Sequence, residues 1–269
     1  MKRFLGVFQR LLAKNKLFVF TLVYIRNQIN IIIGNHITGS INFNINGEKK
    51  IMEYFLPNSS IILDIGANIG QYSEKILSIL GEKDYKLYVF EPSIKCFKEL
   101  QEKFTSSKII FYNYAISNFS GEKDFHEIND TGENSSLIFA NAKGNYKRYK
   151  VEVKQLDELF PEGNNIDFIK IDTEGNDFNV LLGAKQLLKD KRIRAIQFEY
   201  NDSWRYAGHT IIDAINFLNE TDYLTYLIRP DGIYEFDYQF WGEYYHYSNF
   251  LTTTKDNYPN IKQLIKGKF

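Results

Sequence analysis

Residues 61–70, with the sequence IILDIGANIG, constrain the fold of this chain more than any other segment. An apolar, β-branched run carries Asp64, continues through Gly66 and Gly70, and opens into the helical pattern of residues 71–80. Glycine occupies turns where the backbone must fold tightly or approach a ligand closely. The helix directs its partially positive N-terminus into the same space. The pattern predicts a strand, a bare turn and a helix that together bind a nucleotide-like cofactor.

A second carboxylate follows the next predicted strand. Residues 86–90 form an apolar run, and Glu91 comes directly after it. In a doubly wound sheet, a carboxylate at this point accepts hydrogen bonds from both ribose hydroxyls. The dinucleotide fingerprint requires three glycines, GxGxxG, whereas this turn has only Gly66 and Gly70. Asp64 would repel a pyrophosphate, but it suits a ligand with an ammonium group and no phosphate, such as S-adenosylmethionine.

Four segments resemble one family in their order along the chain. They are DIGANIG at 64–70, FEP at 90–92, NYAIS at 113–117 and IKIDTEGNDFNVLLGA at 169–184. Together they resemble the FkbM family of S-adenosylmethionine-dependent methyltransferases, over about residues 56–253. The resemblance implies a Rossmann-like methyltransferase fold. It also implies methyl transfer, usually to a hydroxyl oxygen and often on a sugar or a polyketide.

The resemblance further implies which residues hold the cofactor. The residues implied to hold the methionine end of S-adenosylmethionine are Asp64, Gly66, Asn68 and Gly70. Glu91 would bind the ribose. The residues implied to lie against the adenine are Asn113, Tyr114 and Ala115. The N-terminal region and the segment before residue 166 match the family least, so the acceptor is the part of the function that the resemblance specifies least.

The chemistry is predicted beside Asp172, which follows a short buried strand. Lys170 and Asp172 lie on one face of that strand because side chains alternate along it. Charges at the end of an apolar strand are costly to bury unpaired. One interpretation is therefore an ion pair of Lys170 with Asp172 or Glu174 that supports the turn. The other places Asp172 beside the reacting atoms, as the proton acceptor or orienting group for a hydroxyl.

Two further groups are candidates for the same proton. Glu199 ends the next predicted strand and should lie at the same sheet edge. His209 begins the following helix, and its ordinary pKa suits a base at neutral pH. Asp172, Glu199 and Asp202 offer oxygen ligands for a divalent cation, but their spacing specifies no such site, and we predict none. Trp204 is expected either to stack on a sugar or to close the cleft.

Composition agrees with one soluble α/β enzyme, and the lack of a signal-peptide cleavage site near the N-terminus predicts that it is cytoplasmic. The 269 residues carry 33 basic and 33 acidic side chains, so the net charge gives no sign of nucleic-acid binding. The single cysteine, Cys96, excludes an intramolecular disulfide and a cysteine-cluster metal site. The predicted partner is a small-molecule or glycan acceptor. The sequence predicts no particular oligomeric state.

The N-terminal residues 1–47 differ from the rest because they contain no acidic side chain. Their basic residues are Lys2, Arg3, Arg10, Lys14, Lys16 and Arg26. Apolar side chains recur at helical spacing at Phe4, Leu5, Phe8, Leu11 and Leu12. The apolar run at 17–25 is shorter than the roughly 20 residues that span a bilayer, and no signal-peptidase site follows it. A basic helix of this kind contacts an anionic membrane peripherally, or it packs on its own catalytic domain or a second subunit. We favour packing.

The predicted fold class is α/β, a Rossmann-like methyltransferase fold with a mostly parallel, doubly wound sheet and an antiparallel last strand. Residues 1–47 form an extension, helical to about residue 33 and with a strand at 41–45. Residues 48–269 form the catalytic domain. Its expected strands begin near residue 60 and then cover 86–90, 108–112, 167–171, 194–199, 223–228 and 247–253. Its expected helices lie near residues 49, 71, 93, 177 and 210.

Residues 118–165 are too long for an ordinary connection. They contain strand-like pieces at 122–128 and 149–153 around a polar loop at 129–136. The insertion leaves the sheet beside the predicted adenine site, so it either covers the ligand edge or is an exposed decoration. Two functions of other classes compete with a methyltransferase. A catalytically silent adaptor for glycan synthesis has no need of Glu91, and a nucleotide-dependent oxidoreductase lacks its third glycine.

Overall fold

The chain places its predicted cofactor strands side by side in one large sheet. The computed structural model describes residues 6, 9–10, 12–128, 135–138, 146–161, 163 and 165–269. The strands of the large sheet are β1 (Ile61–Ile65), β2 (Lys86–Phe90), β3 (Ile109–Tyr112), β7 (Phe168–Ile171), β8 (Ala195–Tyr200), β9 (Tyr223–Arg229), β10 (Gly232–Glu235), β11 (Ser248–Thr254) and β12 (Ile265–Lys268). Their spatial order is β12-β10-β9-β11-β8-β7-β1-β2-β3.

The sheet has the direction pattern expected for a doubly wound methyltransferase fold. β3, β2, β1, β7 and β8 run parallel to one another. β11 inserts antiparallel between β8 and β9, which confirms the antiparallel strand predicted near residue 250. It is not the last strand, however, because β12 follows it and pairs with β10. The short strands β10 and β12 escaped the sequence prediction because neither has a long alternating pattern.

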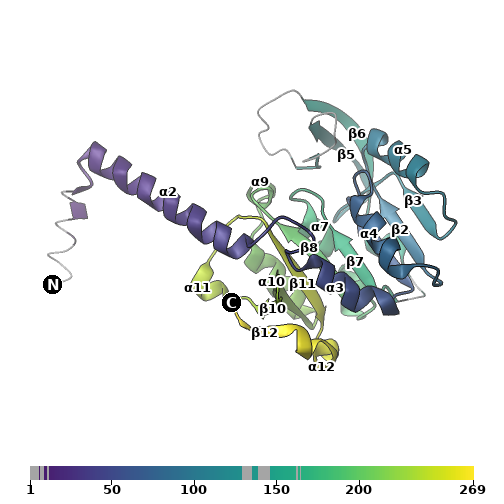
Figure 1. Ribbon diagram of the computed structural model, residues 1–269. Coiled ribbons are helices and arrows are strands. Elements are labelled where there is room, and N and C mark those ends of the chain that lie inside the picture. The colour runs from purple at the N-terminus through teal and green to yellow at the C-terminus, as the bar shows by residue number, and fades with distance from the viewer. Residues whose placement is uncertain are drawn as a thin grey trace.

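Helices cover both faces of this sheet, as Figure 1 shows. One face packs on α3 (Glu48–Phe55), α4 (Gln71–Leu80), α5 (Ile94–Lys103) and α12 (Tyr258–Ile261). The other face packs on α7 (Asp177–Leu182), α8 (Lys185–Lys189) and α10 (Ile211–Glu220). The remaining short helices are η1 (Leu56–Asn58), α6 (Leu156–Leu159), α9 (Ser203–Ala207), α11 (Tyr238–Trp241), η2 (Lys255–Asn257) and η3 (Lys262–Leu264). Burial on both faces explains why the parallel strands are almost continuously apolar.

The insertion forms a second, smaller sheet. β5 (Gly121–Ile128) and β6 (Tyr146–Lys154) pair antiparallel, and β4 (Ala115–Ile116) adds to β6 in parallel. These strands confirm the two strand-like pieces predicted in residues 118–165. Most of the polar loop expected at 129–136 lies outside the described residues. Ser136, which is described, pairs its backbone with His126 of β5 at 2.9 and 3.1 Å.

The N-terminal extension is dominated by one helix, α2 (Lys16–Thr38), which projects from the body in Figure 1. It begins where Asn15 Oδ1 accepts a hydrogen bond from the Phe18 amide, 3.1 Å away. The apolar helical spacing expected at Phe4, Leu5, Phe8 and Leu11 lies outside the described residues. By length and composition alone α2 could cross a membrane, and only 6% of its most apolar window is buried. The apolar segment is thus longer than the nine residues that the sequence indicated.

The strand predicted at residues 41–45 is wrong, because that segment folds into turns. Asn42 Oδ1 accepts a hydrogen bond from the Asn44 amide at 3.0 Å, and Asn46 Oδ1 accepts one from the Glu48 amide at 3.0 Å. Asparagine side chains that bond the backbone two residues on favour such turns over strands. The second turn places Glu48 at the start of α3, on the sheet.

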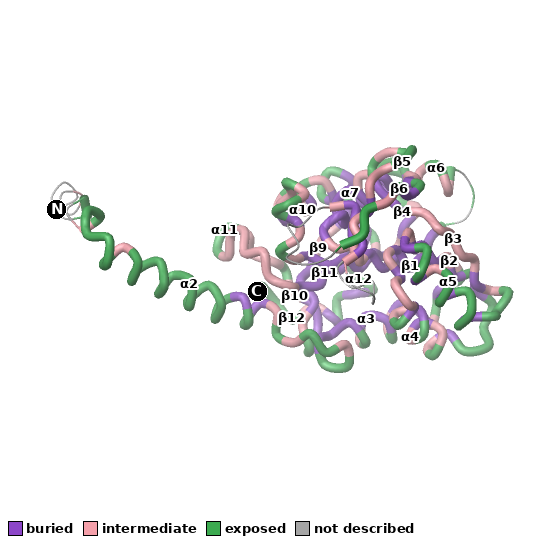
Figure 2. Tube along the Cα trace, turned by 90° about the horizontal axis from the view of Figure 1, so that it is seen from above, coloured by how far each residue is buried: buried purple, intermediate pink, exposed green. Residues whose placement is uncertain are grey.

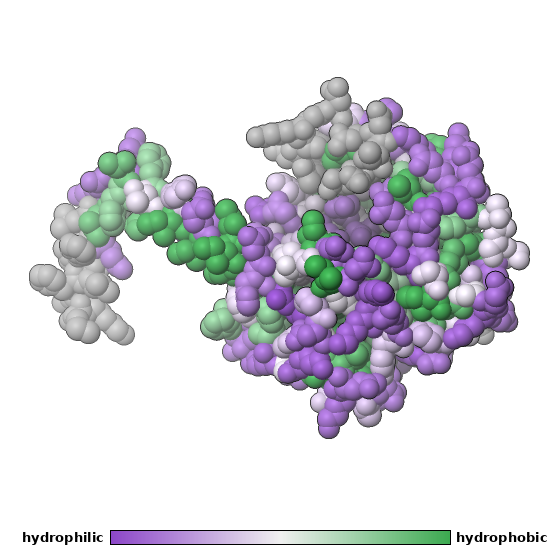
Figure 3. Space-filling view, viewed as in Figure 1, coloured by the Kyte–Doolittle hydropathy of each residue, from purple (hydrophilic) through white to green (hydrophobic). Residues whose placement is uncertain are grey.

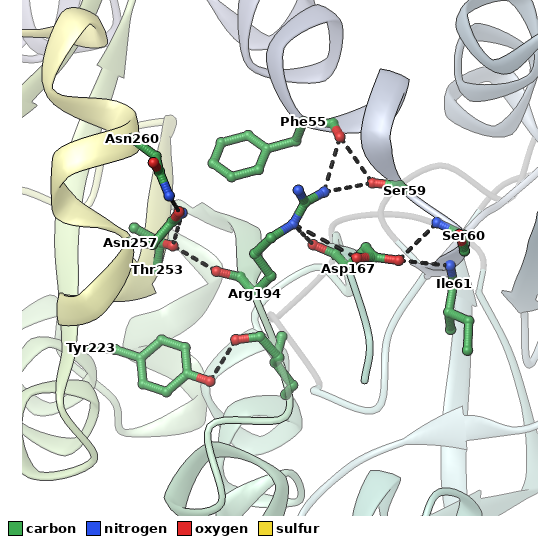
Figure 4. Close-up of polar contacts among 11 residues, drawn as sticks. Phe55, Ser59, Ser60, Ile61, Asp167, Arg194, Tyr223, Thr253, Asn257 and Asn260 are labelled. Carbon is green, nitrogen blue, oxygen red and sulfur yellow. Dashed lines mark hydrogen bonds and ion pairs between the residues drawn. The ribbon is translucent and has the colours of Figure 1, made fainter. Parts of the chain in front are cut away.

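A polar network lies at the amino ends of the parallel strands, opposite the ends that carry the glycine turn (Figure 4). Arg194 Nη2 donates to Phe55 O at 3.0 Å and to Ser59 Oγ at 2.9 Å. Asp167 Oδ2 accepts from the Ser60 and Ile61 amides at 2.7 and 3.0 Å. These bonds connect α3 to the first residues of three strands, so the network fixes where the parallel strands begin.

Candidate active site

The turn between β1 and α4 is held by the end of β2. The amides of Gly66 and Ala67 both donate to Phe90 O, at 3.0 and 3.1 Å. Gly66 has a φ of +81°, and a Cβ on it would lie 1.8 Å from Asp172 O. Asn68 follows with a φ of +49°. Only glycine fits at position 66, because the end of β7 passes directly against it.

Glu91 connects this turn to β2 through its carboxylate. Its two oxygens accept hydrogen bonds from the Asn68 and Ser93 amides, each at 2.8 Å. The side chain is buried, and burial raises the pKa of Glu91 to about 7 against the lowering effect of these two bonds. Asn113 supports the same corner by donating from Nδ2 to Glu91 O at 2.8 Å and to Pro92 O at 3.1 Å. The carboxylate is therefore fixed in place before any ligand arrives.

A cavity, here called the edge cavity, opens at the carboxyl ends of β1, β2 and β7. Its lining residues are Ile65, Gly66, Asn68, Phe90, Glu91, Pro92, Tyr114, Ala115, Ile116, Phe125, Ser135, Ser136, Leu137, Asp172, Thr173, Glu174 and Asn176. The lining includes three carboxylic acids and no lysine or arginine among the described residues. It therefore favours a ligand with positive charge.

The insertion contributes one wall of the edge cavity. Phe125 of β5 and the segment Ser135–Leu137 lie in its lining. Ser136 Oγ donates to Thr173 O at 3.0 Å, which ties the insertion to the turn after β7. The structure thus favours the first interpretation of residues 118–165, a segment that covers the ligand edge.

Three of the residues expected to hold the cofactor lie outside the lining. Asp64 is buried behind the turn, where it accepts a hydrogen bond from Ser73 Oγ at 2.5 Å. Gly70 packs α4 on α5, since a Cβ there would meet Phe104 and Leu100. Asn113 acts through Glu91 and Pro92, as described above. These three shape the turn and the strand ends, while Gly66, Asn68, Glu91, Tyr114 and Ala115 face the cavity.

Lys170 and Asp172 stand on one face of β7, as the alternation predicted. Lys170 Nζ lies 3.3 Å from Asp172 Oδ2, and the lysine side chain is 3% exposed against 36% for the aspartate. Burial disfavours the Lys170 ammonium, but the carboxylates of Asp172, Glu48 and Glu199 outweigh it and raise the lysine pKa. A buried cation therefore supports a carboxylate that reaches into the edge cavity.

Glu174 and Glu199 are two further carboxyl groups whose charges interact with Asp172. Burial, followed by the charges of Asp172 and Asp177, raises the pKa of Glu174 to about 8. Burial and the charge of Asp172 also raise the pKa of Glu199. Asn201 Nδ2 donates to Glu199 Oε1 at 2.6 Å. Because one lysine faces several carboxyls, Glu174 and Glu199 hold protons at neutral pH more readily than ordinary glutamates.

The turn after β7 is held by Asp177, a role that the sequence did not indicate. Its carboxylate accepts hydrogen bonds from the Thr173 amide at 3.2 Å and from the Gly175 amide at 3.1 Å. Asn176, the residue directly before α7, forms no side-chain cap. The signal lay in the Asp that follows Asn176, since a carboxylate in the first turn of a helix can bond back to free amides.

His209 and Trp204 lie away from the edge cavity. His209 Nε2 is 3.1 Å from Asn179 Oδ1, its ring packs edge-on against Phe178, and burial lowers its pKa. Trp204 is fully buried and donates from Nε1 to Glu199 O at 3.0 Å, so it neither stacks on a ligand nor closes a cleft. Within the described part of the chain, no group of three or more His, Cys, Asp or Glu side chains is arranged to hold a metal ion.

Comparison with known families identifies the family of this chain. Residues 64–225 match the methyltransferase FkbM domain, which is more than half of the chain. The chain belongs to the FkbM methyltransferase family. This FkbM methyltransferase therefore uses S-adenosylmethionine, the cofactor of the family. No match is found among curated proteins.

Several solved structures are similar to this FkbM methyltransferase. The methyltransferase FkbM from Methylobacillus flagellatus has 16% identity and a TM-score of 0.47, and the match covers 72% of this chain and 43% of that one. This chain thus spans less than half the length of that protein. A putative S-adenosylmethionine-dependent methyltransferase from Listeria monocytogenes has 11% identity and a TM-score of 0.45, over 77% of this chain and 96% of that one. The plantazolicin methyltransferase BpumL in complex with S-adenosylhomocysteine has 15% identity and a TM-score of 0.44, over 78% and 83%.

Proposed function

We propose that the enzyme methylates a hydroxyl oxygen of a sugar or related glycan, with Asp172 as the proton acceptor. The observation that carries the proposal is the Lys170–Asp172 pair, in which a buried ammonium 3.3 Å away stabilises a partly exposed carboxylate in the edge cavity. That ion pair fixes the position of the Asp172 carboxylate in the edge cavity. An ionised carboxylate beside the reacting atoms is what a hydroxyl nucleophile needs to lose its proton.

The residues of the edge cavity fit S-adenosylmethionine. Its sulfonium and ammonium groups suit a lining with three carboxylic acids and no basic side chain. In this proposal Gly66 and Asn68 hold the methionine end, Glu91 binds the ribose, and Tyr114 and Ala115 lie against the adenine. Thr173 Oγ1, which is buried without a hydrogen-bond partner, is an additional polar atom available to the ligand.

The chain supplies position, exclusion of water and a place for the proton. When bound, the cofactor supplies an electrophilic methyl group and a sulfur leaving group that keeps the electron pair of the broken bond. Asp172 then orients the acceptor hydroxyl and accepts its proton as the new carbon–oxygen bond forms. Lys170 holds the Asp172 side chain in position throughout. Alignment of this kind can supply roughly 7–11 kcal/mol of the barrier reduction.

Two buried polar atoms next to Glu199, outside the lining of the edge cavity, have no hydrogen-bond partner, and in this proposal they are available to a hydroxylated acceptor. They are Gln197 Nε2 and Asn249 Oδ1. Asn249 pairs in register with Glu199 across β11 and β8, and Gln197 is two residues from Glu199 on the same face. One atom is a donor and the other an acceptor, and a hydroxyl group can satisfy both kinds. A phosphate or carboxylate on this side would instead meet the carboxyls of Glu199 and Asp172.

The test is transfer of a radiolabelled methyl group from S-adenosylmethionine to a panel of free sugars, nucleotide sugars and glycans. Asp172→Asn should lower turnover on a productive acceptor by about 100-fold or more, because general base catalysis typically contributes about 10²–10⁴-fold. Its affinity for S-adenosylhomocysteine should stay within a few-fold of the parent protein. Asp202→Asn is the matched control, since Asp202 pairs with Arg205 outside the edge cavity. Full turnover in Asp172→Asn would exclude Asp172 as the proton acceptor.

We infer that the reaction takes place in the cytoplasm, where S-adenosylmethionine is made. The buried free thiol of Cys96 is compatible with a reducing compartment. Cell fractionation should recover the protein with cytoplasmic or inner-face markers. Recovery on the outer side of the cell membrane would contradict this assignment.

A further inference from the structure

Helix α2 leaves a long apolar surface uncovered. Its exposed large apolar side chains are Leu17, Phe18, Phe20, Leu22, Val23, Tyr24, Ile25, Ile29, Ile31, Ile32 and Ile33. Figure 2 shows the helix exposed along most of its length, and Figure 3 shows hydrophobic residues along it as it leaves the body. Contiguous exposed apolar surface marks a site of contact with a partner or a membrane.

The last turn of α2 fixes how the helix is rotated. Ile37 is fully buried in the main core, and Gly34 lies so close to His246 that a Cβ there would be 2.4 Å from the ring. Thr38 Oγ1 donates to Tyr247 O at 2.7 Å. These contacts, together with the stacking of His36 on Trp241 and Phe269, hold the last turn of the helix against the catalytic domain.

Along the rest of the helix, the side that continues from Gly34 and Ile37 is mixed. At about 100° per residue, the residues on it include Lys16, Val19, Val23, Asn27 and Asn30. Another side of the helix carries a continuous apolar stripe formed by Phe18, Leu22, Ile25, Ile29 and Ile32. All five are exposed. This stripe lies N-terminal to the docked last turn of α2, and the catalytic domain leaves it uncovered.

Charge distinguishes a lipid surface from a second copy of the chain. Residues 1–47 contain six lysines and arginines and no acidic residue. Two parallel α2 helices packed along the apolar stripe would bring like charges together, with no carboxylate in the segment to pair them. An anionic membrane offers the complementary charge, and basic groups near it add to the binding of an apolar helix face.

The position of the polar residues argues for a helix that lies on the membrane. The 23 residues of α2 extend about 34 Å, enough to cross the roughly 30 Å hydrocarbon core. A crossing would, however, place Arg26, Asn27, Gln28 and Asn30 near its centre, where such groups are costly. The basic N-terminal flank would also stay on the cytoplasmic side, which would put the catalytic domain on the other side.

We propose that α2 is an interfacial anchor. It lies in the headgroup region of an anionic membrane with the stripe Phe18, Leu22, Ile25, Ile29 and Ile32 in the lipid, and its docked last turn fixes the orientation of the edge cavity above the surface. The anchor uses none of the residues assigned to methyl transfer. A test of membrane binding is therefore independent of a test of the proposed function. It would present the enzyme to acceptors held at the membrane.

Flotation of the full-length protein with vesicles tests the anchor. The protein should float with vesicles of phosphatidylcholine containing about one third phosphatidylglycerol, and at least tenfold less with phosphatidylcholine alone. The double variant Ile25→Asp/Ile29→Asp should lose at least tenfold in binding to the anionic vesicles. The double variant Asn27→Asp/Asn30→Asp makes the same change in net charge on the side that continues from Gly34 and Ile37 and should retain most of the binding. Equal losses in both variants, or no flotation of the parent protein, would overturn the proposal.

Two further measurements separate the remaining arrangements. In a Cys96→Ser background, an environment-sensitive dye on Ile25→Cys should shift to shorter wavelength with anionic vesicles, while the same dye on Asn27→Cys should not. Alkaline carbonate should release the protein from the vesicles; retention would indicate a spanning helix and contradict an interfacial one. A stable dimer in solution that disappears in Ile25→Asp/Ile29→Asp, together with no flotation, would assign the stripe to a second copy instead.

Discussion

Lys170 Nζ lies 3.3 Å from Asp172 Oδ2, and the two side chains share one face of β7 at the edge cavity. The lysine is buried and the aspartate is partly exposed. The lysine can therefore act on a ligand only through its effect on the Asp172 carboxylate. Glu48, which begins α3 just after the N-terminal extension, is also buried near this lysine and contributes to its raised pKa. The charge of a single buried residue thus supports carboxylates from α3, from the end of β7 and from β8.

Replacement of this lysine should affect both stability and turnover. Lys170→Met leaves Asp172 and Glu48 without their buried cation, and removal of one partner of a buried pair typically costs about 3–5 kcal/mol. We expect a loss of that order in the free energy of unfolding at pH 8, measured by urea denaturation. The loss should be smaller at pH 5, because the remaining carboxyls can then take up protons.

Lys170→Arg is the matched control, since it keeps the charge. It should retain most of the stability, while turnover falls because the larger guanidinium cannot occupy the same point. A Lys170→Met protein as stable as the parent at pH 8 would show that the lysine does not compensate these carboxylates.

Cofactor affinity should depend on the charge of Glu91. Glu91→Gln removes an ionised acceptor, and hydrogen bonds to charged groups contribute about 1.5–3 kcal/mol, or roughly 10- to 100-fold in affinity. Calorimetric titration with S-adenosylhomocysteine measures this change. Glu127→Gln is the control, because Glu127 is buried nearby and accepts from Ser93 Oγ at 2.6 Å but does not line the edge cavity. Equal affinity of Glu91→Gln and the parent would remove Glu91 from the ribose site.

The sequence was sufficient for the parallel half of the sheet. Strands such as β1 and β2 are buried on both faces, so their apolar runs and the acids that end them stand out without knowledge of the fold. The antiparallel edge was harder, because β10 and β12 contain four residues each and depend on each other for pairing. A short strand at a sheet edge has too few positions to show a period.

The candidate site was predictable where function follows from position at a strand end. Glu91, Asp172 and Glu199 all follow that rule. The sequence could not show that Asp64 and Gly70 lie outside the cavity lining, because it does not show which face of a strand or turn meets the ligand. Nor could it show that Asp177 holds the turn after β7 or that Leu137, over 70 residues from Gly66, shares a cavity with it, since such contacts depend on tertiary folding.

The Arg194 network should contribute stability without contributing to the site. Arg194→Met removes donors from Phe55 O and Ser59 Oγ, and we expect a loss of about 1–3 kcal/mol in the free energy of unfolding. Affinity for S-adenosylhomocysteine should not change, because the network lies at the opposite ends of the parallel strands. Lys191→Met is the control: its ion pairs with Asp222 and Asp256 are exposed and should contribute no more than about 1 kcal/mol. A cofactor affinity that falls together with stability would show that the two ends are coupled.

The stability of the protein without its cofactor should fall as pH rises through neutrality. Burial raises the pKa of Asp64 to about 6, of Glu91 and Asp177 to about 7 and of Glu174 to about 8. A carboxyl whose pKa is higher in the folded than in the unfolded state binds its proton more tightly when folded. It therefore contributes stability that is complete below the unfolded pKa, near 4, and is lost as pH rises through the folded pKa. Thermal unfolding should show a midpoint that decreases between about pH 5 and pH 8.

The charge of the ligand should reverse part of this loss. S-adenosylmethionine carries a sulfonium that S-adenosylhomocysteine lacks, and a cation in the edge cavity favours the ionised forms of Glu91 and Glu174. Binding of the sulfonium compound at pH 7 should therefore release protons, detected as a binding enthalpy that varies with the ionisation enthalpy of the buffer. The thermal stabilisation by S-adenosylmethionine relative to S-adenosylhomocysteine should grow from pH 6 to pH 8. If the two ligands release the same number of protons, the carboxyls of the edge cavity do not respond to the sulfonium charge, and its position beside Asp172 and Glu174 is wrong.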